Sequence, residues 1–291
     1  MKRKIHGICV ALCTPFTEDG EKVDNYLLKK HIDSMLEARV HNILVCGGTG
    51  EFAYLRPEER KKLVEVASKH IDGKAGFVVQ TSAINTADAV DFSKHAEDNG
   101  ADCLLILPPY FEGPGEEGIC FHFEQISKSV NTSIMVYNIP SNTGVDITPP
   151  FFRRLTEIAN IEYMKDSTGD LIRIQQLLSM RADVLNGGDP IAFYSLLAGC
   201  KGCVWGAVNA MPHEAVMLYE FVQEERIQEA RDLWKRMLPA NNYFWSHEYN
   251  PSVKAATNLS GRKVGPCRYP VQPLSEKDMD ELSQALKPLG F

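Results

Sequence analysis

The chain has 291 residues, of which 44% are hydrophobic and 24% charged, so it can bury a large core and is neither intrinsically disordered nor a collagen-like repeat. Lysine and arginine number 31 against 38 for aspartate and glutamate, and the resulting net charge of -7 argues against nucleic acid or a membrane surface as a partner. No apolar run approaches the roughly 18 residues of a transmembrane helix. The eight cysteines fall mostly inside apolar segments, which is typical of reduced, buried thiols and predicts a cytoplasmic protein.

Short apolar runs rich in β-branched residues recur along the chain, and the segments between most of them have the apolar spacing of helices. The predicted strands lie at 7–16, 43–48, 76–82, 103–109, 133–140, 161–168, 182–189 and 202–209. The predicted helices lie at 24–38, 57–70, 86–99, 116–130, 148–159, 170–180, 190–199 and 212–224. This alternation is typical of βα units around a parallel sheet.

Eight strand and helix pairs use the chain up to about residue 224, a count that predicts an α/β protein of the (β/α)8 TIM barrel class. The barrel is expected over residues 1–225 and carries the active site, and residues 226–291 are expected to form a C-terminal helical extension docked outside it. Three prolines and two glycines make residues 261–273 the predicted internal loop of this extension. A doubly wound sheet stays open as an alternative, because periodicity does not give strand order.

Two polar side chains at the ends of predicted strands are candidates for catalysis. Lys165 follows the apolar run that begins at Ile161, so we expect it in the enclosed mouth of the barrel. Loss of hydration there disfavours the ammonium form and leaves a neutral amine that can attack a carbonyl. Tyr137, one predicted strand earlier, is a candidate proton donor and acceptor. The structural alternatives are a lysine that reaches solvent or pairs with Asp166, and a tyrosine that is simply buried.

The segment Gly47-Gly48-Thr49-Gly50-Glu51 offers approachable backbone N–H groups and a hydroxyl, which suit a carboxylate better than a chain of phosphates. Its alternative is a tight bend after a strand. Cys200 and Cys203 form an isolated CxxC pair without a second pair or a histidine cluster, so neither structural zinc nor redox activity is expected. The histidines lack HxH and HExxH spacing. The sequence therefore predicts no metal site.

Taken together, these segments resemble the superfamily of dihydrodipicolinate synthase and N-acetylneuraminate lyase, the lysine-dependent class I aldolases. The matching segments, in order, are Thr14-Pro15-Phe16, Gly47-Gly48-Thr49-Gly50-Glu51, Pro108-Pro109-Tyr110-Phe111, Glu117-Gly118, Tyr137-Asn138-Ile139-Pro140-Ser141-Asn142-Thr143-Gly144, Lys165-Asp166-Ser167-Thr168-Gly169-Asp170, Gly187-Gly188-Asp189, Asn250-Pro251 and Lys254. The resemblance covers essentially the whole chain.

This resemblance implies a TIM barrel, usually a homotetramer built as a dimer of dimers, in which Lys165 forms a Schiff base with the ketone of pyruvate or another 2-oxo acid. It implies no metal and no organic cofactor. Tyr137 would shuttle protons at the imine, while Thr49 and the N–H groups around Gly48 would hold the carboxylate of the small-molecule substrate. The substrate-binding residues expected on this basis are Gly48, Thr49, Tyr110, Asn142, Gly188 and Val204.

Three positions depart from the pattern of dihydrodipicolinate synthase itself. Gly48 stands where that enzyme has a relay threonine, and Phe111 stands where it has a second tyrosine that is normally lent across a subunit interface. Asn142 stands where it has an arginine that grips the far carboxylate of the aldehyde substrate. Together the departures indicate a different second substrate or leaving fragment.

We therefore expect a Schiff-base lyase, either an aldolase or a dehydratase, that acts on pyruvate or a 2-keto-3-deoxy sugar acid through Lys165. One alternative is a 4-hydroxy-tetrahydrodipicolinate synthase with a modified relay, which condenses pyruvate with aspartate semialdehyde. Another is a barrel without catalytic activity that senses a 2-oxo acid, although Lys165 and Tyr137 argue against it.

Overall fold

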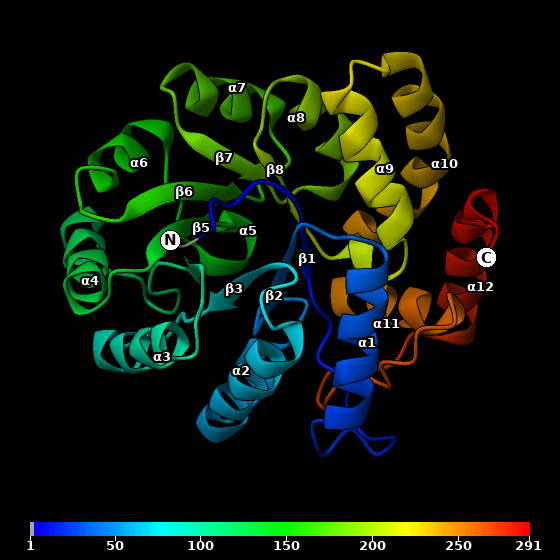
Figure 1. Cartoon of the computed structure of the whole chain (residues 1–291), viewed down its shortest axis with the longest axis horizontal. Helices are drawn as coiled ribbons and strands as arrows, with labels where there is room; N and C mark the ends of the chain where they lie inside the picture. Colours follow the sequence, from blue (N-terminus) through cyan, green and yellow to red (C-terminus); the bar gives the residue numbers. More distant parts are fainter. Residues whose placement is uncertain (1–2) are drawn as a thin grey trace.

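The computed structural model describes residues 3–291, so the first two residues of the predicted barrel lie outside it. Eight strands close into a barrel in chain order, and every neighbouring pair runs parallel (Figure 1). The predicted TIM barrel is confirmed and the doubly wound alternative is wrong, because β1 (Gly7–Ala11) pairs with both β2 (Asn42–Val45) and β8 (Gly202–Trp205) and leaves no open edge.

The remaining strands are β3 (Gly76–Gln80), β4 (Cys103–Ile106), β5 (Ser133–Asn138), β6 (Ile161–Asp166) and β7 (Asp183–Asn186). The helices are α1 (Asn25–Glu37), α2 (Pro57–Ile71), α3 (Thr86–Asp98), α4 (Glu116–Ser129), α5 (Pro140–Thr143), α6 (Pro149–Leu155), α7 (Leu171–Ser179), α8 (Ala192–Leu197), α9 (Pro212–Gln223), α10 (Ile227–Ser246), α11 (Tyr249–Leu259) and α12 (Glu276–Leu286). Short 3-10 turns lie at η1 (Phe52–Tyr54), η2 (Asp189–Ile191), η3 (Ala207–Asn209) and η4 (Lys287–Leu289).

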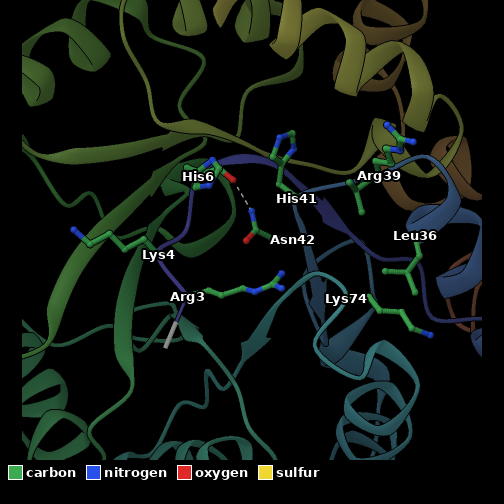
Figure 2. Close-up of a pocket in the computed structure, with 9 residues that line it drawn as sticks. Arg3, Lys4, His6, Leu36, Arg39, His41, Asn42 and Lys74 are labelled. Carbon is green, nitrogen blue, oxygen red and sulfur yellow. Dashed lines mark hydrogen bonds between the residues drawn. The ribbon is translucent and has the colours of Figure 1, made fainter. Parts of the chain in front are cut away.

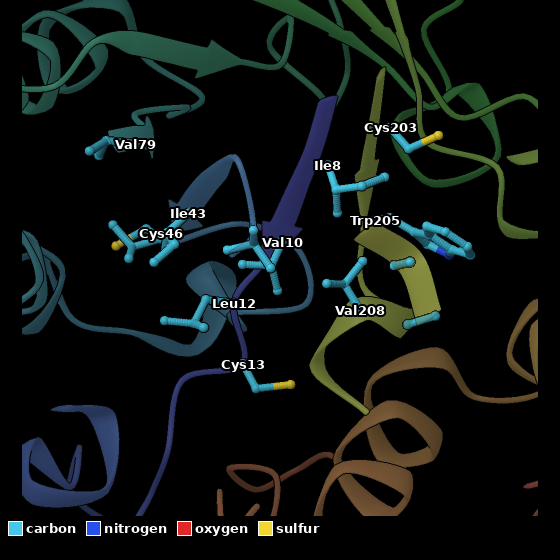
Figure 3. Close-up of a cluster of buried hydrophobic side chains, with 14 of the residues drawn as sticks. Ile8, Val10, Leu12, Cys13, Ile43, Cys46, Val79, Cys203, Trp205 and Val208 are labelled. Carbon is cyan, nitrogen blue, oxygen red and sulfur yellow. The ribbon is translucent and has the colours of Figure 1, made fainter. Parts of the chain in front are cut away.

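Side chains alternate between the two faces of each strand, and this alternation divides the core in two. Ile8 and Val10 of β1 point outward and pack against the surrounding helices, in the layer that Figure 3 shows in part. Cys9 and Ala11 of the same strand point into the barrel, which is filled by Leu44, Val78, Leu105, Met135, Leu185 and residues like them. The interior is a packed core, so chemistry is confined to its two ends.

The signals at the helix ends act as the sequence predicts. Pro57 opens α2 with two glutamates in its first turn, and the Thr148 side chain accepts a hydrogen bond from the Phe151 N–H at the start of α6. The predicted strands at 7–16 and 202–209 are too long, because their last residues leave the barrel wall to form loops and the turn η3. Neither α5 nor the 3-10 turns are among the predicted elements, because they are too short to show a helical period.

The predicted helical extension consists of α10, α11 and α12, and the predicted loop at 261–273 separates the last two. These helices gather on one side of the barrel (Figure 1), where α10 packs against α9 and α11 lies against η3. Trp234 of α10 packs on Trp205 of β8 and on Phe193 of α8. No helix within residues 3–291 has both the length and the apolar character needed to span a bilayer.

Candidate active site

A cavity of about 730 Å³ opens at the carboxyl ends of the barrel strands. Both predicted catalytic residues, Lys165 of β6 and Tyr137 of β5, line it. Four of the predicted substrate-binding residues line it as well, and these are Gly48, Thr49, Asn142 and Val204. The structure thus brings together residues of β5, β6 and β8 with the turn that follows β2, as expected for the carboxyl-terminal face of a TIM barrel.

Lys165 and Tyr137 are partners across the β5/β6 ladder, so their side chains leave the barrel wall on the same face. Lys165 Nζ lies 3.8 Å from the centroid of the Tyr137 ring, and the two residues are 5% and 6% exposed. Within residues 3–291, Nζ has no hydrogen-bond or ion-pair partner, and Asp166 instead bonds Asn138 and Thr168. The two alternatives considered for Lys165, solvation and pairing with Asp166, are both wrong.

Gly187, at the end of β7, leaves the space that the Lys165 side chain occupies. A Cβ atom at this position would lie 2.1 Å from Ser167 Oγ and 2.7 Å from Lys165 Cε. Ser167 Oγ is itself buried and without a partner among the described residues. The lysine stem therefore runs past a glycine and a free hydroxyl on its way to the cavity.

We expect Gly187→Ala to displace Lys165 and to lower the rate of imine formation by more than about tenfold, with a stability loss of about 1–3 kcal/mol from overpacking. Gly115→Ala is the matched control, because a Cβ atom there meets nothing within 4 Å. Borohydride trapping rates and thermal unfolding of both variants would test this. Normal trapping by Gly187→Ala would contradict it.

The glycine-rich turn after β2 is held from several sides. Asn250 Nδ2 of the extension donates to the Gly48 carbonyl at 3.0 Å, and Thr14 Oγ1 donates to the Gly50 carbonyl at 2.6 Å. A Cβ atom on Gly50 would meet the Leu12 carbonyl oxygen at 3.0 Å, so the turn needs glycine to lie this close to β1. Thr49, 7% exposed, is thereby fixed at the rim of the cavity.

Asp189 is a buried carboxylate in the cavity wall that the sequence analysis did not select. Burial raises its pKa to about 7, although hydrogen bonds from Tyr249 Oη at 2.9 and 3.0 Å and the Lys165 charge act in the opposite direction. The indole N–H of Trp205 lies near the carboxylate but makes no regular hydrogen bond with it. This site therefore holds a carboxyl group that changes charge near neutral pH.

Replacement of Asp189 by asparagine should change how stability depends on pH. Folding raises this pKa above its ordinary value of 3.8, so between about pH 4 and 7 the native state binds more protons than the unfolded chain does. The native state therefore loses stability as the pH rises through that window. Asp189→Asn has no such titration, so its free energy of unfolding relative to the wild type should rise by roughly 3 kcal/mol from about pH 5 to 8. Urea unfolding at fixed protein concentration measures the difference. A difference that stays constant with pH would contradict the prediction.

Two predicted substrate-binding residues lie outside the lining of the cavity. Tyr110 is partly buried, packs edge to face against Phe52 at 6.2 Å between ring centroids, and has a pKa that burial raises. Gly188 has its carbonyl and its N–H bonded to the Asn186 side chain, and the lining includes Gly187 in its place. Their roles in binding stay predictions. Phe111 is 69% exposed, so its ring faces solvent in a single chain.

A second cavity, of about 610 Å³, lies at the opposite, amino-terminal end of the strands (Figure 2). Its lining includes the cations Arg3, Lys4, Arg39 and Lys74. In Figure 2 the side chains of Lys4 and Lys74 point in different directions, so these cations do not converge on one point. As far as residues 3–291 line it, this cavity offers neither the lysine and tyrosine pair nor a carboxylate, so the candidate active site is the cavity at the other end of the barrel.

Within residues 3–291, one group of side chains has the spacing of a metal site, with the ligand atoms of His247, Asp278 and Glu281 within 4.8 Å of one another. These residues belong to the extension and are partly or fully exposed, and exposed acidic groups of this kind are common without an ion. All eight cysteines are buried and free, which confirms the prediction of buried thiols. Burial raises the pKa of the Cys46 thiol to about 11, so it is not a reactive thiolate.

Several residues at the cavity escaped the sequence analysis. Asp189 was noted as the end of a predicted strand and as part of a segment that resembles the family, without a role of its own, and Gly206 only as a residue of the predicted strand 202–209. Tyr249 and Trp245 reach the cavity from the extension. The sequence carried no signal for these two, because the docking of α10 and α11 on the barrel cannot be obtained from apolar spacing.

The sequence profile of the dihydrodipicolinate synthetase family matches residues 4–289. Two curated relatives are 33% identical to the chain: the 4-hydroxy-tetrahydrodipicolinate synthase of Methanothrix thermoacetophila, over 96% of this chain and 95% of the relative, and that of Clostridium perfringens, over 98% of each. Among solved structures, the chloride inhibited dihydrodipicolinate synthase from Acinetobacter baumannii complexed with pyruvate is 30% identical and covers 99% of each chain at a TM-score of 0.94. A monomeric dihydrodipicolinate synthase variant is 29% identical and covers 98% of this chain and 97% of its own at a TM-score of 0.92. The likeness extends over the barrel and the extension alike.

Proposed function

Because the chain belongs to the dihydrodipicolinate synthetase family, a family of Schiff-base lyases, we propose that its Lys165 forms the imine with the ketone of a 2-oxo acid. The observation that carries the proposal is the environment of Lys165 Nζ. Lys165 is buried, its Nζ has no hydrogen-bond or ion-pair partner within residues 3–291, and Nζ lies 3.8 Å from the centroid of the Tyr137 ring. An amine that no hydrogen bond or ion pair holds in place can approach the carbonyl carbon of a 2-oxo acid bound in the cavity. Tyr137 supplies a hydroxyl for proton transfer beside it.

The substrate is pyruvate or a 2-keto-3-deoxy sugar acid, with its carboxylate at the Thr49 turn. This choice is supported by the charges around the cavity. Its described lining includes no arginine, while Asp189 and Glu248 contribute carboxyl groups. A far carboxylate would meet no guanidinium there, whereas the hydroxyls of a sugar acid can bond Asn142 and Ser141.

The competing function is that of a 4-hydroxy-tetrahydrodipicolinate synthase, which condenses pyruvate with aspartate semialdehyde. The names of the two curated relatives favour it. The two functions share the imine with pyruvate and differ in the second step. Turnover measured with 2-keto-3-deoxy sugar acids and with aspartate semialdehyde in parallel would separate them, and efficient condensation with the aldehyde would overturn the sugar-acid assignment.

The experiment for the imine is borohydride reduction in the presence of pyruvate, followed by peptide mass spectrometry. Reduction converts an imine into a stable secondary amine on the lysine that formed it. We expect the adduct on Lys165. If no adduct forms with pyruvate or with longer 2-oxo acids on folded protein, the proposed mechanism is wrong and a binding protein without catalysis becomes the better explanation.

We propose a homotetramer built as a dimer of dimers. Exposed apolar side chains on several elements support it, and these include Phe111, Phe121 of α4, Ile172 of α7, Tyr194 and Leu197 of α8 and Met217 of α9. A dimer of dimers needs two different self-complementary surfaces. Sedimentation velocity would test this, and a monomer at micromolar concentration would overturn it.

Two further assignments complete the proposal. We place the protein in the cytoplasm, supported by eight free, buried cysteines in a chain with no disulfide within residues 3–291. Residues 1–225 form the catalytic barrel and residues 226–291 an extension that completes the site through Trp245 and Tyr249. The extension is accordingly an addition to the barrel and not an independent domain.

A further inference from the structure

Tyr249, the first residue of α11, reaches from the extension into the wall of the cavity that contains Lys165. Its hydroxyl donates to Asp189, with Oη 3.0 Å from Oδ1 and 2.9 Å from Oδ2. Asp189 is 1% exposed and lines the same cavity. A buried carboxylate therefore fixes the position of a hydroxyl that faces the reaction space.

Gly206, directly after β8, makes room for this arrangement. A Cβ atom on Gly206 would lie 2.5 Å from Tyr249 Oη and 2.8 Å from Thr49 Oγ1. Both hydroxyls thus lie close to the same point, one from the extension and one from the turn expected to hold the substrate carboxylate. Any larger residue at this position would separate Tyr249 from the barrel.

The proposed imine chemistry includes two successive proton-transfer steps, which gives a second proton-transfer group besides Tyr137 a role. Formation of the imine expels water, and conversion of the imine to its enamine removes a proton from C3 of the substrate. Gly48 and Phe111 carry no proton-transfer group, and the Phe111 ring is 69% exposed. Tyr249 is the tyrosine of the extension that lines the cavity with its hydroxyl on a buried acid.

We infer that Tyr249 is a catalytic proton-transfer residue at the imine and that Asp189 is its positioning partner and proton acceptor, an inference that rests on the proposed function of Lys165. In enamine formation the C3–H bond breaks and its electron pair forms the C2=C3 bond, which neutralises the iminium nitrogen. The C3 proton passes to Tyr249 Oη, and the proton already on that oxygen passes to the Asp189 carboxylate. The reverse transfers protonate the enamine.

The groups that face Asp189 determine how this pair responds to pH. They are Lys165 from β6, Tyr249 from α11, and Trp205 and Cys203 from β8. Burial, and after it the Asp189 carboxylate, raises the pKa of Tyr249 well above its ordinary value. Only the ionised form of Asp189 can accept the proton. Proton removal from C3 should therefore accelerate as the pH rises through the titration of Asp189, at about pH 7.

Exchange of the pyruvate methyl protons with D2O, followed by proton NMR, measures this step without a second substrate. We expect Tyr249→Phe to form the borohydride adduct on Lys165 to the wild-type extent and to exchange the methyl protons about 10²-fold more slowly, the lower end of the usual contribution of acid–base catalysis. Asp189→Asn should exchange more slowly as well, and its rate should no longer rise near neutral pH. Tyr243→Phe is the matched control, because it removes a tyrosine hydroxyl of the extension that donates to the Asp278 carbonyl at 2.8 Å outside the cavity.

The outcomes distinguish a failure of the role of Tyr249 and Asp189 from a failure of the proposed imine on Lys165. Normal trapping and normal exchange in Tyr249→Phe would overturn the role of Tyr249 and leave the proposed function of Lys165 intact. Absence of trapping in the wild type would overturn the proposed function and this inference with it. If Tyr249→Phe unfolds more readily than Tyr243→Phe, the exchange rate of Asp189→Asn as a function of pH becomes the deciding measurement. An exchange rate that still rises near pH 7 in Asp189→Asn would overturn the role of the pair.

Discussion

Lys165→Met should abolish the borohydride adduct and lower turnover by a factor between roughly 10⁴ and 10⁶, the range seen when an enzyme loses its nucleophile. The protein should be as stable as the wild type or more so. Lys165 is 5% exposed without a partner within residues 3–291, and burial of an unpaired amine opposes folding, whereas methionine has a similar volume and no charge. Mass spectrometry of the trapped protein and thermal unfolding check the two parts.

The matched control is Lys94→Met, which changes an exposed lysine on α3 and should leave trapping and turnover unchanged. An adduct that persists in Lys165→Met would show that another lysine forms the imine. A large loss of stability in Lys165→Met would show that the lysine is structural, and the assignment of the nucleophile would then have to be abandoned.

Lys254→Met should destabilise the protein by about 3–5 kcal/mol, because it leaves a buried carboxylate without its counter-charge. Lys254 Nζ lies 2.6 Å from Glu51 Oε1, and the two side chains are 2% and 0% exposed. Lys254 also donates to the Pro266 carbonyl at 2.7 Å, and Glu51 accepts from the Arg268 N–H at 2.9 Å. The pair joins the extension to the turn that carries Thr49.

Urea unfolding at fixed protein concentration measures this effect. The double replacement of Glu51 and Lys254 by methionine should be less destabilising than Lys254→Met alone, since it leaves no isolated charge. Lys62→Met is the control, because its pair with Glu65 at 3.1 Å is exposed and should contribute less than about 1 kcal/mol. A loss below about 1 kcal/mol for Lys254→Met would contradict the structural role assigned to the pair.

Local sequence patterns were sufficient to predict the order of the barrel strands and of the main helices between them, and to place Lys165 at the end of its strand. Eight apolar runs separated by helical segments predict eight βα units, since each strand must be apolar on both faces when helices cover the barrel. Proline at the first position of α2 and Thr148 before α6 act within one turn of the chain, so their signals are readable without tertiary structure. Lys165 lies in the last two residues of β6, so its place at the carboxyl end depends only on that strand.

The closure of the barrel and the composition of its mouth depended on contacts between distant segments. The pairing of β1 with β8 excludes the doubly wound sheet, and no periodicity specifies it. Tyr249 and Asp189 are far apart in sequence and meet only because α11 docks beside η3. The sequence by itself determined the elements and the nucleophile, since those follow from local patterns. Only the tertiary structure showed that Asp189, Gly187 and Tyr249 lie near that nucleophile, because their positions depend on how the barrel closes and on how the extension packs on it.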